Sequence, residues 1–284
     1  MALKRELAAA VAIPIVLAVV FFLPPLAFHL LVATVTLGAL WEFYRLAERT
    51  GHPVAKTVGM LAGALVFAAA VVRWSSMSSR TPSGLLGALP VEAIPAGELL
   101  LVLAAVFLAS VAPLLASVPP ASSLAGAGST VIGVLSVPLP ATALCFLRFC
   151  SPRAVLLLFL LVWGCDSFAY YVGKSLGRRK LAPIASPNKT WEGAIGGLVG
   201  ATLIGAAAGT WWVLPELGPA RGALAGALAS TAGQMGDLVE SLWKRGAGVK
   251  DSGVFLPGHG GFYDRIDSLL WAGPVLALFV ATLP

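Results

Sequence analysis

Charged side chains are scarce in this 284-residue chain, and so are the residue types that most often carry catalysis. Asp, Glu, Lys and Arg together make up 11% of the sequence, whereas a soluble domain carries about a quarter. There are three His and three Cys residues, and only five of the 13 acidic residues are Asp. With 58% hydrophobic residues and a mean hydropathy of +0.90, the composition excludes an ordinary water-soluble globular domain.

The few cysteines argue against two kinds of site. Cys145, Cys150 and Cys165 lie in apolar surroundings, without the paired spacing of a zinc site or the regular spacing of a disulfide framework. Cys145 and Cys150 are near enough in sequence to pair, but packing against other apolar residues is the favoured role. We therefore predict that all three are packing residues.

Long apolar runs are what the sequence has instead. Nine runs approach the roughly 20 residues that a helix needs to cross a bilayer, and Pro or Gly separates most of them. The first run follows Lys4 and Arg5 as a secretory signal would, but it lacks a small-x-small cleavage site, so we expect a retained helix. The predicted spans are 7–23, 26–44, 55–72, 98–117, 127–148, 153–173, 191–213, 220–241 and 265–283.

The basic residues test this topology, because cytoplasmic loops of membrane proteins carry an excess of Lys and Arg. With a cytoplasmic N-terminus, nine spans place 14 of the 19 Lys and Arg residues inside and five outside. Basic residues spread in this way serve topology, and no nucleic-acid partner is expected. The sequence thus predicts an all-α polytopic membrane protein with its N-terminus in the cytoplasm and its C-terminus outside.

The first part of the chain, residues 1–150, carries little chemistry. We predict that it is a scaffold of transmembrane helices, in which residues 73–97 form an external loop. Glu42 lies between Trp41 and Tyr44 near the cytoplasmic end of the second span, where aromatic residues hold a helix at the membrane interface. Glu42 is therefore given no role in a site.

The second part, residues 151–284, is the predicted catalytic region, with cytoplasmic loops at 174–190 and 242–264. Its first polar stretch contains Asp166, basic residues beside glycines, a predicted turn at Ser186–Thr190 and then Glu192. This composition suits phosphate binding, although a basic loop that contacts anionic lipid would look the same. Asp166 and Glu192 contribute nothing to topology, so they would hold a metal, position Lys189 or pair with an arginine.

The second polar stretch, residues 236–268, holds four of the five Asp residues. One helix face there carries acids and a lysine at i, i+3, i+4 and i+7, namely Asp237, Glu240, Ser241 and Lys244. Asp264 and Asp267 begin the last span, so two helix ends that face one compartment would present carboxylates to each other. Compensation of the helix dipole would also explain Asp264 and Asp267.

Carboxylates arranged in this way are suited to magnesium, which prefers oxygen ligands and substrate phosphates. Phosphoryl and nucleotidyl transfer need such a site, with added cations that offset the charge of the transferred group. The glycine-rich segment Pro257–Gly261 precedes a helix N-terminus, which favours phosphate. His259 within it is a turn residue, a phosphate ligand or an acid for the leaving group.

Several motifs together resemble the signature of the phosphatidate cytidylyltransferase (CDP-diacylglycerol synthase) family. They are Ser241-x-x-Lys244-Arg245, Lys250-Asp251-x-Gly253, Pro257-Gly258-His259-Gly260-Gly261 and Asp264-Arg265-x-Asp267. The first polar stretch resembles an upstream block of the same family, through Asp166, Ala169-Tyr170, Gly173, Gly177, Ser186-Pro187, Lys189-Thr190 and Glu192-Gly193. The motifs cover residues 160–270, and the helices before them are similar only in character.

The resemblance implies that phosphatidic acid attacks the α-phosphorus of CTP, giving CDP-diacylglycerol and pyrophosphate. It implies a magnesium-dependent site that faces the cytoplasm, with the number of ions left open, and a homodimer. Asp237 and Asp264 are the implied metal ligands. The implied catalytic residues are Asp237, Asp264, Asp267, Lys244 and Lys250, and the implied substrate-binding residues are Asp166, Ser186, Lys189, Glu192, Arg245, His259, Gly260, Gly261 and Arg265.

Three other activities would require some of the same features. A CTP-dependent polyprenol kinase would need similar residues but would transfer the γ-phosphate. The Asp-Gly-x-x-Ala-Arg pattern of CDP-alcohol phosphotransferases does not occur in the sequence. A proton-coupled transporter would need repeated halves and broken helices at mid-bilayer, whereas the polar residues here are confined to one side and to the C-terminal part. The composition suits a bacterial inner-membrane protein.

Overall fold

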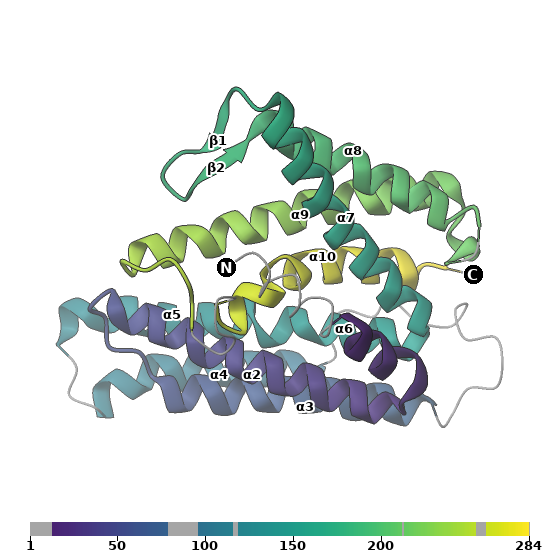
Figure 1. Ribbon diagram of the computed structural model, residues 1–284. Helices are drawn as coiled ribbons and strands as arrows, with labels where there is room; N and C mark the ends of the chain where they lie inside the picture. The colour runs from purple at the N-terminus through teal and green to yellow at the C-terminus, as the bar shows by residue number, and fades with distance from the viewer. Residues whose placement is uncertain (1–12, 79–95, 116–118, 212, 254–259, 284) are drawn as a thin grey trace. The chain divides into compact units, whose positions relative to one another are not determined.

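The computed structural model describes residues 13–78, 96–115, 119–211, 213–253 and 260–283, most of which are helical (Figure 1). The helices are α2 (Pro25–Arg49), α3 (Lys56–Ser78), α4 (Ala96–Leu115), α5 (Pro120–Ser136), α6 (Pro138–Cys150), α7 (Pro152–Leu176), α8 (Trp191–Ala208), α9 (Pro219–Gly246) and α10 (Tyr263–Ala281). The described elements also include a shorter apolar helix, Ile13–Phe22, a 3₁₀ turn, η1 (Pro215–Leu217), and two strands, β1 (Lys180–Ala182) and β2 (Ser186–Thr190). The expected helical class is confirmed.

Five helical segments in the described ranges are long and apolar enough to cross a membrane, so the chain is a multi-pass membrane protein. They are Pro25–Arg49, Lys56–Trp74, Pro120–Cys150, Pro152–Leu176 and Trp191–Ala208. The number of nine spans and the sides on which the two termini lie stay predictions.

The predicted span 127–148 lies within the segment Pro120–Cys150, which is divided into α5 and α6 at Val137. The break has a local cause, because Pro138 and Pro140 have no amide hydrogen and cannot donate to the preceding turn. Val137 has φ −117° and ψ −73°, and its amide still donates to the Gly133 carbonyl oxygen over 3.1 Å.

The predicted external loop at 73–97 is shorter than expected at both ends. Helix α3 continues to Ser78, and α4 already begins at Ala96. The guanidinium of Arg73 lies over the ring of Trp74, 4.5 Å from its centroid, which is a favourable cation–π contact within the helix. Residues 79–95 lie outside the described residues.

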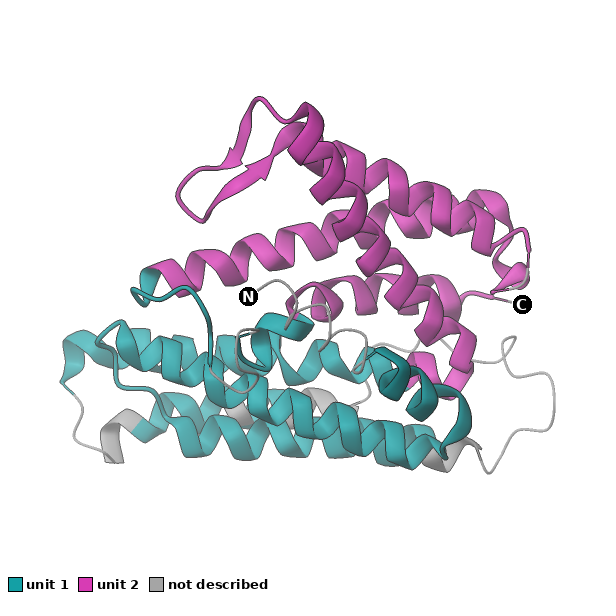
Figure 2. Cartoon of the chain, in the orientation of Figure 1, with its two compact units in different colours: residues 1–80, 91–145, 246–266 teal, residues 81–90, 146–245, 267–284 magenta. Residues whose placement is uncertain are grey.

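The chain divides into two compact units, each of which is described by itself (Figure 2). Unit 1 comprises residues 1–80, 91–145 and 246–266, so a C-terminal segment packs with the N-terminal helices. In its core the fully buried Tyr44 of α2 donates its hydroxyl to the Thr130 carbonyl oxygen of α5 over 2.9 Å. The Thr130 hydroxyl accepts from the Ala55 amide over 3.0 Å, which joins the α2–α3 connection to α5.

Unit 2 comprises residues 81–90, 146–245 and 267–284, and its helices approach one another closely at glycines. A Cβ atom at Gly197 of α8 would lie 2.9 Å from the Cys165 carbonyl oxygen of α7. The backbones of α8 and α9 are in direct contact at Gly205 and Gly222. A Cβ atom on either glycine would overlap the carbonyl oxygen of the other. Small residues at these positions permit the close contacts on which helix association in membranes depends.

The predicted loop at 174–190 contains the antiparallel hairpin of β1 and β2, in which Lys180 pairs with Thr190 and Ala182 with Ser186. The predicted turn at Ser186–Thr190 is therefore wrong, since these residues form β2 and the turn lies at 183–185. A proline is tolerated at an edge strand, and Pro187 is on such a strand in this two-stranded sheet.

Candidate active site

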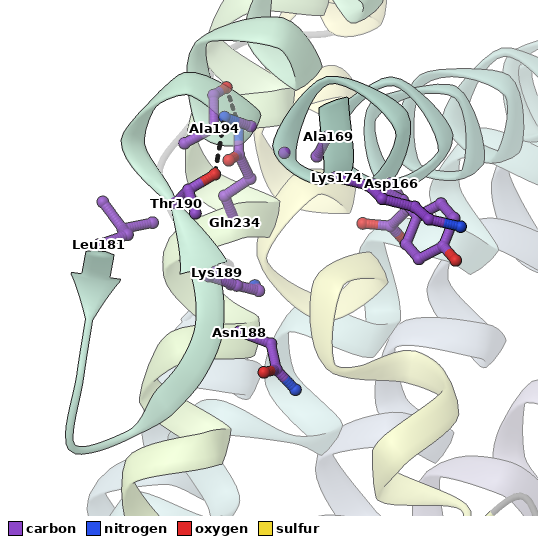
Figure 3. A pocket seen from close by; sticks show the side chains of 12 residues that line it. Asp166, Ala169, Lys174, Leu181, Asn188, Lys189, Thr190, Ala194 and Gln234 are labelled. Atoms are coloured by element: carbon purple, nitrogen blue, oxygen red, sulfur yellow. Dashed lines mark hydrogen bonds between the residues drawn. The ribbon is translucent and has the colours of Figure 1, made fainter. Parts of the chain in front are cut away.

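A cavity of about 490 Å³ lies in unit 2 between the C-terminal half of α7 and the hairpin (Figure 3). Its volume falls in the range of pockets for small ligands. Asp166 lines it from α7, Lys189 from β2 and Gln234 from α9, so three elements contribute polar groups. The remaining lining residues are Ala169, Tyr170, Gly173, Lys174, Leu181, Asn188, Thr190, Gly193 and Ala194.

Thr190 and Glu192 fix the hairpin at the start of α8. The Thr190 hydroxyl accepts from the Gly193 amide over 3.1 Å and so caps the helix. Glu192 accepts from the backbone amides of Arg178 and Arg179, over 3.0 and 3.2 Å. Of the roles considered for Glu192, these contacts favour positioning of Lys189. The Glu192 carboxylate connects the backbone before β1 to the start of α8, and so holds the hairpin that carries Lys189.

Lys189 extends from the hairpin to α9, where its ammonium forms an ion pair with the Asp237 carboxylate. Both side chains keep about 30% of their surface exposed, so the pair remains accessible beside the cavity that Lys189 lines. The Ser241 hydroxyl also donates to Asp237, over 3.3 Å. A lysine that reaches both a cavity and a carboxylate is well placed to neutralise a phosphate bound there.

Asp237, Glu240 and Asp267 gather their carboxylates within 4.8 Å of one another in unit 2. Two come from α9 and one from α10, as the helical spacing predicted for α9. Three carboxylates this close repel one another unless cations offset them. Their hard oxygen donors fit magnesium by chemistry, and partial exposure of Asp237 and Asp267 leaves room for water or a phosphate oxygen in the coordination shell.

Two basic residues of α9 have partners within unit 2. Lys244 forms an ion pair of 2.6 Å with Glu240, whose side chain is almost fully buried at 1% exposure. Arg245 donates from Nε to the Ala185 carbonyl oxygen in the hairpin turn, over 3.3 Å. The sequence predicts that both residues bind substrate. In the structure Lys244 contacts an acid of the cluster, and Arg245 contacts the hairpin.

Asp264 lies in unit 1, where it organises the backbone before α10. Its Oδ2 accepts from the amide of Ser252 over 2.9 Å, from the Ser252 hydroxyl over 2.8 Å and from the amide of Gly261 over 2.7 Å. Gly260 has φ +79°, a conformation that glycine adopts without strain. The predicted metal role of Asp264 stays a prediction, and the contacts above describe a carboxylate that holds a loop together.

Glu42 makes contacts with the motif segment that the sequence reasoning missed. Its side chain in α2 is buried, and its Oε2 accepts from the Tyr263 amide over 2.9 Å. The single hydrogen of the Ser252 hydroxyl is shared between Glu42 Oε2, at 2.9 Å, and Asp264 Oδ2, at 2.8 Å. A Cβ at Gly253 or Gly261 would overlap the Glu42 carboxylate, so glycine is required at both positions. The available signal was a single carboxylate within an apolar helix, which is costly and usually functional.

The remaining predicted residues are placed as follows. Ser186 begins β2, and Arg265 is exposed near the start of α10. Lys250 lies in unit 1 and lines a second cavity with residues of α2. His259 lies outside the described residues. Unit 2 therefore brings together Asp166, Lys189, Asp237, Lys244 and Asp267, and unit 1 brings together Lys250, Gly260, Gly261 and Asp264.

The chain is similar in sequence to several bacterial phosphatidate cytidylyltransferases. A phosphatidate cytidylyltransferase of Brucella abortus (strain 2308) is 42% identical over 167 residues, which cover 55% of this chain and 58% of that protein. Proteins of the same name from Synechocystis sp. (44% over 128 residues; 45% of this chain and 43% of that protein) and Staphylococcus haemolyticus (46% over 140 residues; 48% and 54%) are also similar. The aligned residues span about half the length of these relatives.

A family model described as "Cytidylyltransferase family" matches residues 3–283, which is nearly the whole chain. The match therefore includes the N-terminal helices of unit 1 as well as the cavity, the hairpin and the acids of unit 2. The predicted resemblance is confirmed at the level of the family, and the chain belongs to the cytidylyltransferase family.

Proposed function

We propose that the chain is a CTP:phosphatidate cytidylyltransferase. A phosphate oxygen of phosphatidic acid bonds to the α-phosphorus of CTP, the bond from that phosphorus to the β-phosphate bridging oxygen breaks, and pyrophosphate leaves with the bonding electrons. The product is CDP-diacylglycerol. The observation that carries the proposal is the convergence of Lys189, Asp237, Glu240 and Asp267 beside a ligand-sized cavity, in a chain of this family.

The cations of unit 2 support transfer of a charged group. Lys189 lines the cavity and contacts Asp237, so it is placed to bind a CTP phosphate at the cavity wall. Lys244 neutralises the buried Glu240 and keeps the acid cluster from being wholly anionic. Charge on the transferred phosphoryl group is spread over its oxygens, so positioning and electrostatic stabilisation supply most of the catalysis.

The nucleophile requires no strong base. A phosphate monoester loses its second proton with a pKa of about 6 and is already an anion near neutral pH. The residues therefore have to hold two anions close together, which is the task of Lys189 and its neighbours. Asp237 with Asp267 and Glu240 forms the donor set proposed for magnesium, which when bound would offset charge on the phosphates.

Unit 1 contributes residues that the resemblance assigns to the same reaction. Asp264 and Gly261 hold the segment that enters α10, and the proposal gives Asp264 a further role as a metal ligand. The resemblance also supports a site that faces the cytoplasm, a bacterial inner membrane and a homodimer. These remain parts of the proposal.

The test is incubation of the purified chain with phosphatidic acid and CTP, with product analysis by thin-layer chromatography and mass spectrometry. The proposal expects CDP-diacylglycerol and an equal amount of pyrophosphate, both abolished by EDTA and restored by excess magnesium. In a parallel reaction with a polyprenol in place of phosphatidic acid, phosphorylation of the polyprenol with release of CDP would support the kinase alternative instead. Absence of any lipid product with magnesium present would contradict the proposal.

A further inference from the structure

A second cavity, of about 340 Å³, lies within unit 1 and uses a helix that the sequence treated as scaffold. Arg45, Leu46 and Arg49 line it from the last two turns of α2. Residues 249–253 line it from the opposite end of the sequence, with Lys250 among them. The cavity thus joins basic residues that are far apart in the chain.

The acids nearest in sequence to Arg45 and Arg49 are already engaged. Glu42 accepts from Ser252 and Tyr263, and Glu48 forms a 3.1 Å ion pair with Lys56. Arg45, Arg49 and Lys250 have no ion pair with a described residue, and one acid, Asp251, lines the cavity with them. Three cations with one acid leave an excess of positive charge on the cavity wall.

The position of Lys250 is fixed by the contacts of Glu42 with the same segment. The Ser252 hydroxyl donates to Glu42 on α2 over 2.9 Å, and Ser252 is buried. Glu42, Arg45 and Arg49 follow one another at i, i+3 and i+7 and share a face of α2. The contact that holds Ser252 on this face therefore also holds Lys250 near the two guanidinium groups.

Two ordinary explanations cover only part of this arrangement. Arg49 in the last turn of α2 interacts favourably with the helix dipole, and basic residues at a cytoplasmic helix end follow the positive-inside rule. Neither explanation requires a cavity or a lysine contributed by a distant segment. Guanidinium groups bind phosphate oxygens in pairs of parallel hydrogen bonds, and a lysine adds a point charge.

We propose that Arg45, Arg49 and Lys250 form a binding site for a phosphate group. The ligand is a phosphate borne either by a soluble polyphosphate or by a lipid headgroup at the membrane surface. The proposal assigns Arg45 and Arg49 a direct contact with the ligand, and it concerns binding alone. Lys250 is also among the residues that the resemblance implies for catalysis, but the test below reads binding without turnover, so its failure is distinguishable from failure of the transfer reaction.

The test measures the reaction of phenylglyoxal with individual arginines of the full chain in phosphatidylcholine nanodiscs, read by peptide mass spectrometry. One arm adds inorganic pyrophosphate, and the other replaces part of the lipid with phosphatidic acid. Arg45, Arg49 and the control Arg153 are all exposed and open to the reagent before any ligand is added. At saturation one of the two probes should slow labelling of Arg45 and Arg49 about tenfold and leave Arg153 unchanged.

Variants show whether the protection belongs to this site. Lys250→Gln should reduce the protection of both arginines severalfold, whereas Lys250→Arg should retain it because the charge is kept. Lys180→Gln is the matched control, since Lys180 is an exposed lysine of β1 that does not line the cavity. Protection by pyrophosphate identifies a soluble ligand, and protection by phosphatidic acid identifies a lipid headgroup. Equal labelling with and without both probes would overturn the proposal, as would protection that Lys250→Gln reduces no more than Lys180→Gln does.

Discussion

Asp237 is the residue on which the charged contacts of unit 2 converge. It accepts from Ser241, forms an ion pair with Lys189 and lies within 4.8 Å of a carboxylate oxygen of Glu240 and of Asp267. Because Lys189 lines the cavity, Asp237 connects the cavity to the acid cluster. The residue therefore has both structural contacts and a proposed chemical role, which variants can separate.

Asp237→Asn keeps the size of the side chain and removes its charge. Since the proposed role depends on charge, turnover of CTP should fall by about a hundredfold or more, while the unfolding temperature changes little. Ser241→Ala is the matched control, because it removes only the 3.3 Å hydrogen bond to Asp237 and should cost less than about tenfold. An Asp237→Asn protein that turns over within threefold of the parent would remove Asp237 from the site.

Glu240 offers a test of burial. Its ion pair with Lys244 is 2.6 Å long with side-chain exposures of 1% and 12%, so Glu240→Gln breaks an ion pair that is largely shielded from solvent. The expected loss of stability is about 3–5 kcal/mol, measured by thermal unfolding in detergent. Glu48→Gln breaks an ion pair with Lys56 at the surface, where the exposures are 44% and 19%. It should cost no more than about 1 kcal/mol, and equal losses in the two variants would contradict the assignment.

At the scale of elements, glycine contacts decide how closely the helices of unit 2 approach. Gly205 on α8 and Gly222 on α9 place backbone against backbone, and neither position has room for a Cβ. Helix propensity alone would favour alanine at both positions by about 1 kcal/mol. The close contact therefore outweighs propensity.

Gly222→Ala should destabilise the chain by about 1–3 kcal/mol, because α9 must move away from α8. Gly128→Ala in α5 is the matched control, since nothing lies within 4 Å of the Cβ position there. It should be neutral or slightly stabilising. The comparison uses unfolding temperatures in one detergent, and a Gly222→Ala protein as stable as Gly128→Ala would show that the helices do not depend on this contact.

The connection from α2 to the segment before α10 is the other element-scale feature. Glu42→Gln places an amide NH₂ or a weaker acceptor opposite the Tyr263 amide and the Ser252 hydroxyl. We expect a loss of about 1–3 kcal/mol, and faster hydrogen exchange at the Ser252 and Tyr263 amides. Exchange at the Thr130 amide in α5 should stay as in the parent. Unchanged exchange at Ser252 and Tyr263 would show that Glu42 does not hold this segment.

Sequence reasoning reached some of these features and not others, for physical reasons. The face of α9 that carries Asp237, Glu240 and Lys244 follows from helical spacing alone, and the structure brings Asp237 and Glu240 together with Asp267. Glu42 was missed because its partners Ser252 and Tyr263 are 210 and 221 residues away in sequence. Local patterns carry no information about contacts of that range.

The hairpin shows a different limit. The local sequence preference of Ser186 and Pro187 predicts a turn. In the structure this segment is a strand, because it pairs with β1 and is held by the contacts of Thr190 and Glu192. Tertiary contacts decide such short segments, whereas long apolar runs determine their own helices. The helical class could therefore be predicted, but the strands could not.

At the scale of the whole molecule, two compact units share one chain whose sequence interleaves them. Unit 1 takes residues 246–266 from the C-terminal region. The functional division predicted at residue 150 stays a prediction. The N-terminal helices contribute Glu42, Arg45 and Arg49 beside motif residues of that segment. On this basis we expect the N-terminal part to take part in binding as well as in support.

The central claim is the transfer of the cytidylyl group, and labelled CTP tests it most directly. The purified chain receives phosphatidic acid with CTP carrying a radioactive phosphorus at the α position, and in a parallel reaction at the γ position. The account predicts that the α label enters the lipid in a magnesium-dependent reaction, and that the γ label appears only in pyrophosphate. Label from the γ position in the lipid, or no label in the lipid from either, would contradict it.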